Sequence, residues 1–573
     1  MKKTVRVLVI ITLVLVLMVG AVIAFIMYRR YSPGKTHGDL TSYFGVSEGQ
    51  VAIVLQDELS EYKGVKKDGH IYIPVSLVSE HFNDKFYWDN NDLVLVLTTP
   101  TEIITATDGR TKYSINDKNV KNEFGCPVVI LNENSSTGEH EAYVSIEFAE
   151  YYSPFEYQAF ENPDRVLINY NFDVTAQYAE ATKDVPLRKL AGIKSDILED
   201  VKKGDRVMVL DGNEDGYGFI KIMSGSGVIG YARGDSFGAT KEEGFTTDYV
   251  APEYSHTLMD ETVKLGFHQV ASVYANSDID TVLANGTDIN VICPTWFQSS
   301  DNNGNIQSFA EYDYVDKAHN AGIQVWGLCD DFSNDNKIGK VLSSTSSRKK
   351  LEKNLVSEAI KYSLDGLNID FEYVTSENGI DFVQFIRELS VMCRKYELVL
   401  SIDNYPLPMY TAHYNRTAQA EVADYIITMA YDEYVSQEDG PGPNSSLTYV
   451  NDAIAGAKQE IPDEQSIIAL PLYCRFWAGK KNKVPTPETY GMKQSYDIVA
   501  NHGINPEWDE ATSLYYATYE GSDGKTYQVW LETVDTLELK FAAVKDSNAA
   551  GVAFWKLGLE DSDVWNSVKK SFG

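Results

Sequence analysis

Cysteine is scarce in this sequence, and the little that is present forms no motif. The 573 residues contain five cysteines, and no two of them are spaced as C-x-x-C. An odd number of widely spaced cysteines argues against both a disulfide framework and a cysteine-based zinc module. We therefore predict a fold held together by its apolar cores, with no metal and no cofactor. The five residues are Cys126, Cys293, Cys329, Cys393 and Cys474.

Positive charge is also in short supply. Lys and Arg number 50 against 83 Asp and Glu, which gives a formal net charge of −33. Because nucleic-acid backbones are bound by basic surfaces, this balance argues against a nucleic-acid partner. Apolar residues (43%) and aromatic residues (12%) are plentiful enough for packed cores, which excludes a disordered chain. At about 150 residues per domain, the length predicts several domains.

One long uncharged run stands near the N-terminus. Residues 7–27, "VLVIITLVLVLMVGAVIAFIM", contain no charge. At about 1.5 Å per residue, a helix of this length spans a bilayer core of about 30 Å. The run is longer than the apolar part of a cleaved signal peptide, and "MYRRYSPGK" follows in place of a small-residue cleavage site. We predict a cytoplasmic tip and membrane anchor over 1–30, with the C-terminal body outside the cell; a cleaved signal is the alternative.

Two similar segments follow a short polar linker (31–40). One begins "HIYIPVSLVSEHF" at residue 70, and the other begins "EAYVSIEFAEYY" at residue 141. Each copy predicts a strand, a short amphipathic helix, a turn and a second strand. The pattern resembles the repeat of copper amine oxidase N-terminal-like domains, and we expect such an α+β domain over 41–175. No metal-ligand pattern is recognisable in the copies, so a spacer or wall-binding role is the simpler interpretation.

A second small module is expected over residues 184–237. Its short alternating strands are interrupted by Gly and Asp turns, a pattern typical of a small β-barrel. "KKGDRVMVL" and "GVIGYAR" resemble bacterial SH3-like domains, which often bind cell-wall peptides. The resemblance implies either a contact with a wall peptide or a spacer.

The pattern changes at about residue 245. Eight apolar runs alternate with helical stretches over residues 245–573, from "VKLGFHQV" to "AGVAFWKLG". Such an alternation predicts an α/β fold, a (β/α)8 TIM barrel. The gap between the seventh and eighth runs is the longest, and "SLYYATYEGSDGKTYQVWLE" within it alternates like an inserted hairpin.

Three acids and an asparagine fall in the fourth of these runs, "LDGLNIDFEYV" (364–374). Alternate residues of a strand share a face, so Asn368, Asp370 and Glu372 are expected to project into the barrel, with Glu372 nearest its C-terminal rim. Buried carboxylates are costly unless they are hydrogen-bonded or protonated. Together with Asp365, so many acids in one strand favour a functional interpretation over a structural one.

The placement of these acids narrows the chemistry. Most glycosidases hold two carboxyl groups on opposite sides of the scissile bond. Asp370 and Glu372 stand on one strand and would approach a sugar from the same side, so neither can act as a nucleophile from the opposite face. The remaining route is substrate-assisted: a 2-acetamido oxygen of the sugar attacks the anomeric carbon and forms an oxazolinium ion. This route requires an N-acetylated sugar.

"DGLNIDFE" resembles the D-G-x-D-x-D-x-E signature of glycoside hydrolase family 18. "MAYDEY" resembles the M-x-Y-D motif of the sixth strand, and "GVAFWKLGLED" carries a Trp on the eighth. Asn368 departs from the Asp of many chitinases, and this variant resembles the branch of spore-cortex and cell-wall N-acetylglucosaminidases. An amide at this position could still hold Asp370 by a hydrogen bond, but it could not share a proton with it.

The resemblance implies a role for each matching residue. Glu372 would be the general acid and base, Asp370 would orient the acetamido group and stabilise the oxazolinium, and Tyr431 would bind the acetamido oxygen. The expected supporting residues are Asp365, Asn368, Asp432 and Met429. The expected substrate-binding residues are Trp555, which would stack under the sugar, Trp296, Trp326, Trp477 and Glu433.

The sequence therefore predicts a membrane-anchored, exported hydrolase of β-1,4-linked N-acetylglucosamine, most plausibly in peptidoglycan. Two alternatives stay open at this point. One is a chitinase or an endo-N-acetylglucosaminidase that acts on other glycans. The other is a non-catalytic, chitinase-like carbohydrate-binding protein; such proteins typically lose the acid, which is present here as Glu372.

Overall fold

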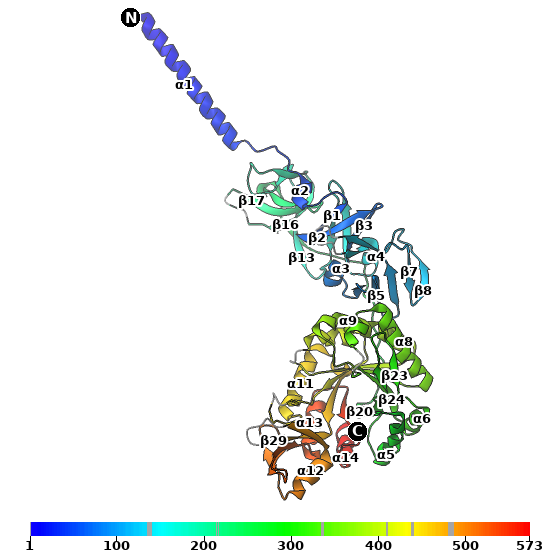
Figure 1. The fold of residues 1–573 in the computed structure, drawn as a ribbon. Helices are drawn as coiled ribbons and strands as arrows, with labels where there is room; N and C mark the ends of the chain where they lie inside the picture. The colour runs from blue at the N-terminus through cyan, green and yellow to red at the C-terminus, as the bar shows by residue number, and fades with distance from the viewer. Residues whose placement is uncertain are drawn as a thin grey trace. The chain divides into compact units, whose positions relative to one another are not determined.

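The computed structural model describes residues 2–133, 140–213, 215, 217–333, 337–407, 411–436, 440–479 and 486–573. The chain divides into two compact units. The first comprises Met1–Phe86, Ala106–Tyr113 and Asn119–Ala251, and the second comprises Tyr87–Thr105, Ser114–Lys118 and Pro252–Gly573. Figure 1 traces the chain from blue to red, with the second unit mainly in green to red.

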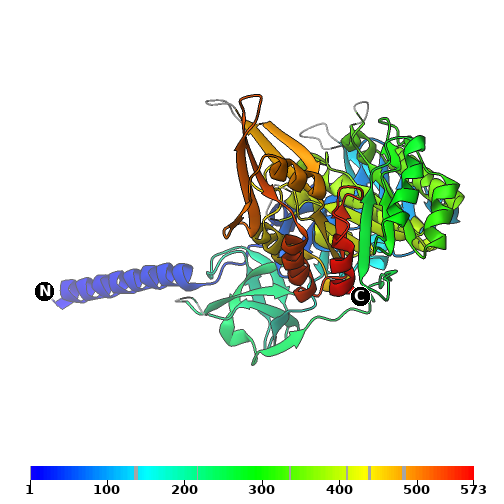
Figure 2. The same cartoon turned by 90° about the horizontal axis from the view of Figure 1, so that it is seen from below.

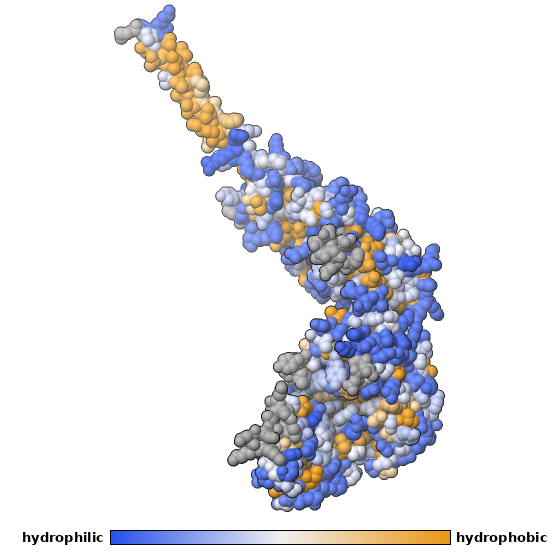
Figure 3. Space-filling view, in the orientation of Figure 1, coloured by the Kyte–Doolittle hydropathy of each residue, from blue (hydrophilic) through white to orange (hydrophobic). Residues whose placement is uncertain are grey.

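The first unit begins with one long helix, α1 (Lys2–Tyr31), none of whose residues is buried. It is long and apolar enough to cross a membrane, by length and composition. Figure 3 shows an apolar surface along this helix between hydrophilic ends. A candidate span therefore covers the predicted residues 7–27, and a signal sequence would have the same character.

The two similar segments both contain a strand, a helix and a hairpin of strands. The first segment forms β3 (His70–Pro74), α3 (Val75–His81), β4 (Phe86–Asp89) and β5 (Val94–Thr98). The second forms β10 (His140–Ser145), α4 (Ile146–Tyr151), β11 (Glu156–Phe160) and β12 (Arg165–Asn169). Both copies thus hold one strand more than the sequence predicted, because each turn is preceded by a short strand of its own.

Most of these strands join one seven-stranded sheet in the order β11-β12-β1-β2-β3-β10-β9. The remaining members are β1 (Gln50–Leu55), β2 (Glu58–Lys67) and β9 (Val129–Glu133). A five-stranded sheet has the order β4-β5-β6-β7-β8, with β6 (Ile103–Thr107), β7 (Lys112–Ile115) and β8 (Lys118–Lys121). Helix α2 (Leu40–Phe44) precedes both sheets, and Asp39 caps its N-terminus.

The predicted small barrel lies in a second seven-stranded sheet, whose order is β15-β14-β18-β17-β16-β13-β19. Every named pairing in it is antiparallel. The strands are β13 (Thr175–Glu180), β14 (Val185–Arg188), β15 (Ile197–Val201), β16 (Arg206–Asp211), β17 (Phe219–Ser224), β18 (Ile229–Arg233) and β19 (Lys241–Gly244). Strands β13 and β19 lie outside the predicted bounds of 184–237, whereas the resemblance to SH3-like domains stays a prediction.

Eight parallel strands of the second unit close into a barrel. Their order is β21-β20-β34-β28-β27-β26-β25-β24, and the pairing of β21 with β24 completes the ring. The eight apolar runs recognised in the sequence supply them, one each, so the predicted TIM barrel is confirmed. The strands are β20 (Val263–His268), β21 (Val291–Pro294), β24 (Gln324–Asp330), β25 (Gly366–Asp370), β26 (Val399–Asn404), β27 (Tyr425–Met429), β28 (Ser466–Pro471) and β34 (Gly551–Trp555).

Helices follow the strands of the barrel and lie outside it (Figure 1). They are α5 (Ile279–Ala284), α6 (Tyr312–Asn320), α7 (Ile338–Leu342), α8 (Thr345–Tyr362), α9 (Gly379–Lys395), α10 (Arg416–Ala420), α11 (Leu447–Glu460), α13 (Val534–Asp546) and α14 (Val564–Phe572). One apolar cluster packs between strands and helices, and another, which includes Leu265, Trp326 and Tyr425, fills the interior. The barrel is therefore a packed core, whose chemistry is confined to one end.

An insertion separates β28 from β34. It forms a five-stranded sheet in the order β30-β29-β33-β32-β31 together with α12 (Met492–Asn501), coloured orange to brown in Figure 2. The strands are β29 (Tyr473–Gly479), β30 (Thr486–Gly491), β31 (Glu507–Asp509), β32 (Leu514–Glu520) and β33 (Thr526–Leu531). The predicted hairpin is the pair β32–β33. The seventh apolar run, "SIIALPLYCRFW", supplies two strands, because β28 stops at Pro471 and the chain then turns into β29.

Candidate functional site

Strand β25 places the predicted acids at the C-terminal end of the barrel. It ends at Asp370, and Glu372 follows two residues later. Asn368 and Asp370 are buried, while Glu372 is half-buried and reaches solvent. The strand alternates as expected, because Leu367 and Ile369 belong to the apolar layer under the helices. A half-buried acid thus stands at the rim, above a buried one.

Acids from two neighbouring strands join Asp370. Asp330 of β24 pairs with Asp370 in the strand register, and Asp403 of β26 is buried beside it. Burial raises the pKa of Asp370 well above its usual range, and the charges of Asp403 and Glu372 raise it further. Burial likewise raises the pKa of Asp403 to about 8, although the hydrogen bond from Asn368 opposes this rise. Closely spaced buried carboxyl groups retain protons together.

Asn368 does not hold Asp370, contrary to the expectation from sequence. Its Nδ2 donates to Ser401 Oγ at 3.0 Å and to Asp403 Oδ1 at 2.9 Å. Asp370 Oδ1 is buried without a hydrogen-bond partner among the described residues. The amide therefore acts on the neighbouring strand, and the free oxygen of Asp370 remains available to a ligand.

Glu372 is held from two sides. The Tyr405 hydroxyl donates a hydrogen bond to Glu372 Oε2, and the backbone N–H of Glu372 donates to Asp331 Oδ1 at 3.0 Å. Asp331 also accepts from the N–H of Tyr373 at 2.9 Å, which fixes the chain beyond the strand. Burial raises the pKa of Glu372, the Tyr405 hydrogen bond opposes this rise, and the charges of Asp432 and Asp330 add to it. A raised pKa keeps the carboxyl group protonated for acid catalysis.

The segment after β27 contributes Tyr431 and Asp432. Burial raises the pKa of the Tyr431 hydroxyl, which therefore stays a hydrogen-bond donor, and Asp370 is among the charges that act on it. Asp432 accepts from the Tyr473 hydroxyl and forms an ion pair with Arg475. Its backbone is in the left-handed region (φ 61°). Both predicted residues thus lie within electrostatic range of the acids on β25.

Two apolar residues line the same end of the barrel. Met429 ends β27 in step with Tyr425 and Ile427, both of which belong to the interior cluster. Trp555 ends β34, is half-buried, and packs on Phe267 with ring centroids 5.5 Å apart. Its remaining exposed surface fits the predicted stacking under a sugar.

Three predicted sugar platforms are wrong in this structure. Trp296 and Trp326 have 0% and Trp477 has 1% of their surface exposed. Trp296 and Trp477 donate from Nε1 to Asn276 Oδ1 and to the carbonyl oxygen of Gly442, which satisfies their polar edges inside the fold. Trp326 stacks on Tyr425 in the barrel interior. A ring with no exposed face cannot stack on a sugar.

Asp365 and Glu433 are also placed differently from the prediction. Asp365 precedes β25 and accepts from the N–H of Val325 at 2.7 Å, near His319, so it lies at the opposite end of the strand from Glu372. It supports the barrel floor and cannot support the acids. Glu433 accepts from the N–H of Ser446 at 2.7 Å and thereby stabilises the start of α11. Its carboxylate is engaged within the protein, which argues against substrate binding.

Sequence analysis did not identify four residues at the C-terminal end of the barrel strands: Asp330, Asp331, Asp403 and Tyr405. Each lies within the last two residues of a barrel strand or directly after it, in the runs "IQVWGLCDDF" and "ELVLSIDNY". Acids at the C-terminal ends of barrel strands face the active end of this fold, so the same rule that singled out Asp370 could have found them. Within the described residues of the barrel unit, these acids do not form a group close enough to share a metal ion.

Comparison with known proteins agrees with this geometry. The model of the family "Glycosyl hydrolases family 18" matches residues 261–560. The cortical fragment-lytic enzyme of Bacillus subtilis (strain 168) is 25% identical over 252 residues, covering 41% of this chain and 58% of the relative. Chitinase A1 of Niallia circulans is 24% identical over 288 residues, covering 41% and 40%. The chain thus spans between two fifths and three fifths of the length of these two relatives.

A solved structure supports the fold. The spore cortex-lytic enzyme SleL of Bacillus cereus superposes with a TM-score of 0.50 at 18% identity, over 56% of this chain and 76% of that protein. The family match covers more than half of the 573 residues and includes the whole acid-bearing end of the barrel. The chain belongs to glycosyl hydrolase family 18.

Proposed function

We propose that this protein is a membrane-anchored, exported glycosidase that cleaves β-1,4-linked N-acetylglucosamine in peptidoglycan. The main support is Glu372, a half-buried acid with a raised pKa that stands at the open end of the barrel above the buried Asp370. Among its relatives, the cortical fragment-lytic enzyme of B. subtilis bears a name that implies a cell-wall substrate.

In the proposed mechanism, Glu372 protonates the leaving oxygen while the acetamido oxygen of the bound sugar attacks the anomeric carbon. Asp370 accepts the acetamido N–H through its unpartnered Oδ1 and stabilises the positive charge of the oxazolinium. The Tyr431 hydroxyl donates to the acetamido oxygen. Glu372, now ionised, then takes a proton from water, whose oxygen bonds to the anomeric carbon as the bond between that carbon and the acetamido oxygen breaks.

The other parts of the chain fit this proposal as accessories. Helix α1 would anchor the enzyme, with the body outside the cell. The α+β repeats of 41–175, which resemble copper amine oxidase N-terminal-like domains, would act as a spacer. The SH3-like module of 184–237 would contact wall peptides. A chitinase is the second candidate, favoured by the match to Chitinase A1.

One digestion experiment separates these functions. Purified peptidoglycan and chitin oligomers are treated with the protein, and the new reducing ends are identified by mass spectrometry. N-acetylglucosamine ends on peptidoglycan fragments support the proposal, and muramic acid ends contradict it. Cleavage of chitin oligomers alone favours the chitinase.

The same assay tests the acid. Glu372→Gln should lower the rate by about 10²–10⁴, the usual contribution of a general acid. Glu377→Gln, an exposed residue of the same loop, should leave the rate unchanged. A thiazoline that mimics the oxazolinium should inhibit; a rate unaffected by it would contradict the substrate-assisted route.

A further inference from the structure

Three side chains far apart in the sequence come together in the first unit. His70 begins β3, Cys126 lies between β8 and β9, and Glu147 is in the first turn of α4. One ligand atom of each, a ring nitrogen, the Sγ and a carboxylate oxygen, lies within 4.8 Å of the other two. None of these residues belongs to the site of the barrel, and the proposed hydrolysis does not use them.

Contacts around the three residues hold them in place. Glu147 Oε2 accepts from Ser145 Oγ at 2.7 Å, which leaves Oε1 to face His70 Nδ1. Cys126 is buried in an apolar cluster with Tyr72, Ile130 and Tyr143. Outer contacts of this kind orient the ligands of a metal and are part of its site.

The spacing within the group leaves room for an ion. Glu147 Oε1 and His70 Nδ1 are 3.6 Å apart, which is too long for a hydrogen bond. Zinc binds these atom types at about 2.0–2.3 Å, so tetrahedral ligand atoms are about 3.5 Å from one another. The group therefore needs to contract only slightly around a zinc ion.

A cavity lies next to the group. Cys126 and the preceding Gly125 line a cavity of about 400 Å³, together with Lys112, Lys121 and Asn122. A Cβ built on Gly125 would lie 4.0 Å from the His70 ring, so the loop passes close to the ligands. The cavity therefore borders the residue that supplies the sulfur and the loop that passes the His70 ring.

We propose that His70, Cys126 and Glu147 bind one zinc ion, with the fourth position open to water. Zinc accepts nitrogen, sulfur and oxygen ligands in one site, whereas calcium and magnesium require oxygen alone. The ion would link β3, the loop before β9 and α4, and would stabilise the sheet that carries them.

Zinc binding is measured on the full chain in detergent by competition with a chromophoric chelator, after the protein has been stripped of metal. We expect one equivalent of tightly bound zinc and a higher melting temperature. Cobalt should produce a thiolate charge-transfer band. Cys126→Ser should abolish that band, and His70→Gln and Glu147→Gln should weaken zinc binding at least tenfold, in line with the loss of one ligand.

Two control variants isolate the site. His37→Gln removes an exposed histidine of the same unit, and Cys393→Ala removes a buried thiol of the barrel; neither should change zinc binding. Circular dichroism of each metal-free variant shows whether it folds, and His70→Gln decides the outcome if Cys126→Ser does not. The absence of saturable binding, or binding that survives the loss of His70, overturns the proposal.

Discussion

Opposing influences set the protonation of Glu372. Burial and the nearby acids raise its pKa, whereas the hydrogen bond from Tyr405 lowers it. Because a general acid is active only while protonated, its pKa sets the alkaline limit of the pH–rate profile. In the proposed mechanism, where Glu372 is the general acid, Tyr405 would therefore set how far into the alkaline range the enzyme works.

Removal of this hydroxyl tests the relation. In Tyr405→Phe the lowering influence disappears, so the pKa of Glu372 rises and the alkaline limb of kcat/KM moves to higher pH. Profiles of both proteins on a soluble oligomer measure the shift. Tyr373→Phe, an exposed tyrosine beside Glu372, is the control and should leave the limb in place. A limb that stays or moves to lower pH contradicts the role of Tyr405.

Asp403 makes the stability of the barrel depend on pH. Its pKa is about 8 in the folded protein, against about 3.9 in an unfolded chain. Between these values the folded state binds the additional proton, so a rise in pH from about 4 to about 8 lowers stability. Asp403→Asn cannot titrate, and its amide oxygen can still accept from Asn368.

We expect the melting temperature of Asp403→Asn, relative to that of the wild type, to increase steadily as the pH rises from 4 to 8. Differential scanning calorimetry at several pH values measures the difference. The melting temperature of Asp316→Asn, a substitution at an exposed position of α6, should differ from that of the wild type by the same amount at every pH. If the difference in melting temperature between Asp403→Asn and the wild type were the same at every pH, the carboxyl group of Asp403 in the folded wild type would be ionised across this range.

Sequence analysis was most informative where the two-residue period of a strand fixes the direction of each side chain. Asn368, Asp370 and Glu372 point as predicted because alternation leaves no other choice once the strand is known. Asp365 is out of step with them and lies before the strand begins. The burial of Trp296, Trp326 and Trp477 depends on neighbours from distant segments, which periodicity does not reveal. The same holds for His70, Cys126 and Glu147, whose spacing matches no motif.

At the scale of elements, the eight barrel strands were predictable because each is a short apolar run between helical stretches. The end of β28 was not predictable, since "ALPLYCRFW" is apolar except for Arg475, and only the fold shows that the chain leaves the barrel after Pro471. The extra short strands in the repeats were also missed. They hold only four or five residues, too few for periodicity to register.

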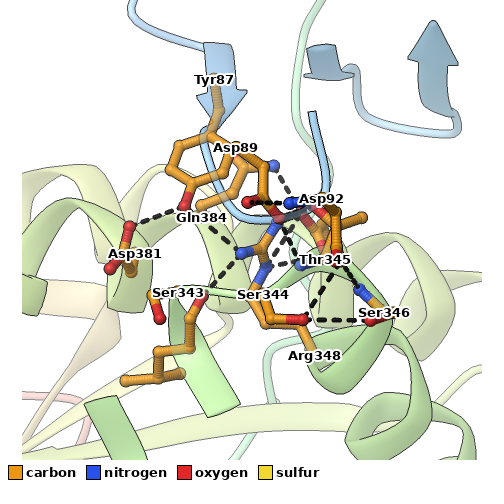
Figure 4. Close-up of polar contacts among 12 residues, drawn as sticks. Tyr87, Asp89, Asp92, Ser343, Ser344, Thr345, Ser346, Arg348, Asp381 and Gln384 are labelled. Atoms are coloured by element: carbon orange, nitrogen blue, oxygen red, sulfur yellow. Dashed lines mark hydrogen bonds and ion pairs between the residues drawn. The ribbon is translucent and has the colours of Figure 1, made fainter. Parts of the chain in front are cut away.

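Helix α8 begins at a cluster of polar contacts within the second unit (Figure 4). Asp89 accepts from the N–H and the hydroxyl of Thr345, both at 2.5 Å, and Asp92 accepts from the N–H of Ser346 at 2.7 Å. The first N–H groups of a helix have no partner within it, and acids favour this end of its dipole. The turn between β4 and β5 therefore stabilises the start of α8.

Asp89→Ala should destabilise this unit by about 1–2 kcal/mol, the usual cost of a lost cap, with an additional cost for the buried Thr345 hydroxyl. Urea denaturation followed by tryptophan fluorescence measures the change, because seven of the eight tryptophans lie after residue 245. Asp316→Ala serves as the exposed acid for comparison and should change the midpoint little. Equal midpoints for Asp89→Ala and the wild type would show that the turn does not hold the helix.

At the scale of the whole molecule, one end of the chain differs from all the rest. Helix α1 exposes apolar residues on every side, and none of them is covered by another part of the protein. Exposure of an apolar surface of this size to water is unfavourable, and its burial in the hydrocarbon core of a bilayer is favourable. A cleaved signal would satisfy the same pattern during export and would then be lost.

Removal of residues 2–31 separates the two possibilities. If α1 is an anchor, the full chain should stay in the membrane fraction through washes with high salt and alkaline carbonate, and its mature N-terminus should include the helix. The shortened chain, produced without export, should be soluble and hydrolyse a soluble oligomer at the same rate, because the acids lie on the barrel. Arg29→Ala, which leaves the apolar run intact, should remain membrane-bound. A full chain recovered from the medium without its first residues would identify α1 as a signal and contradict the anchor.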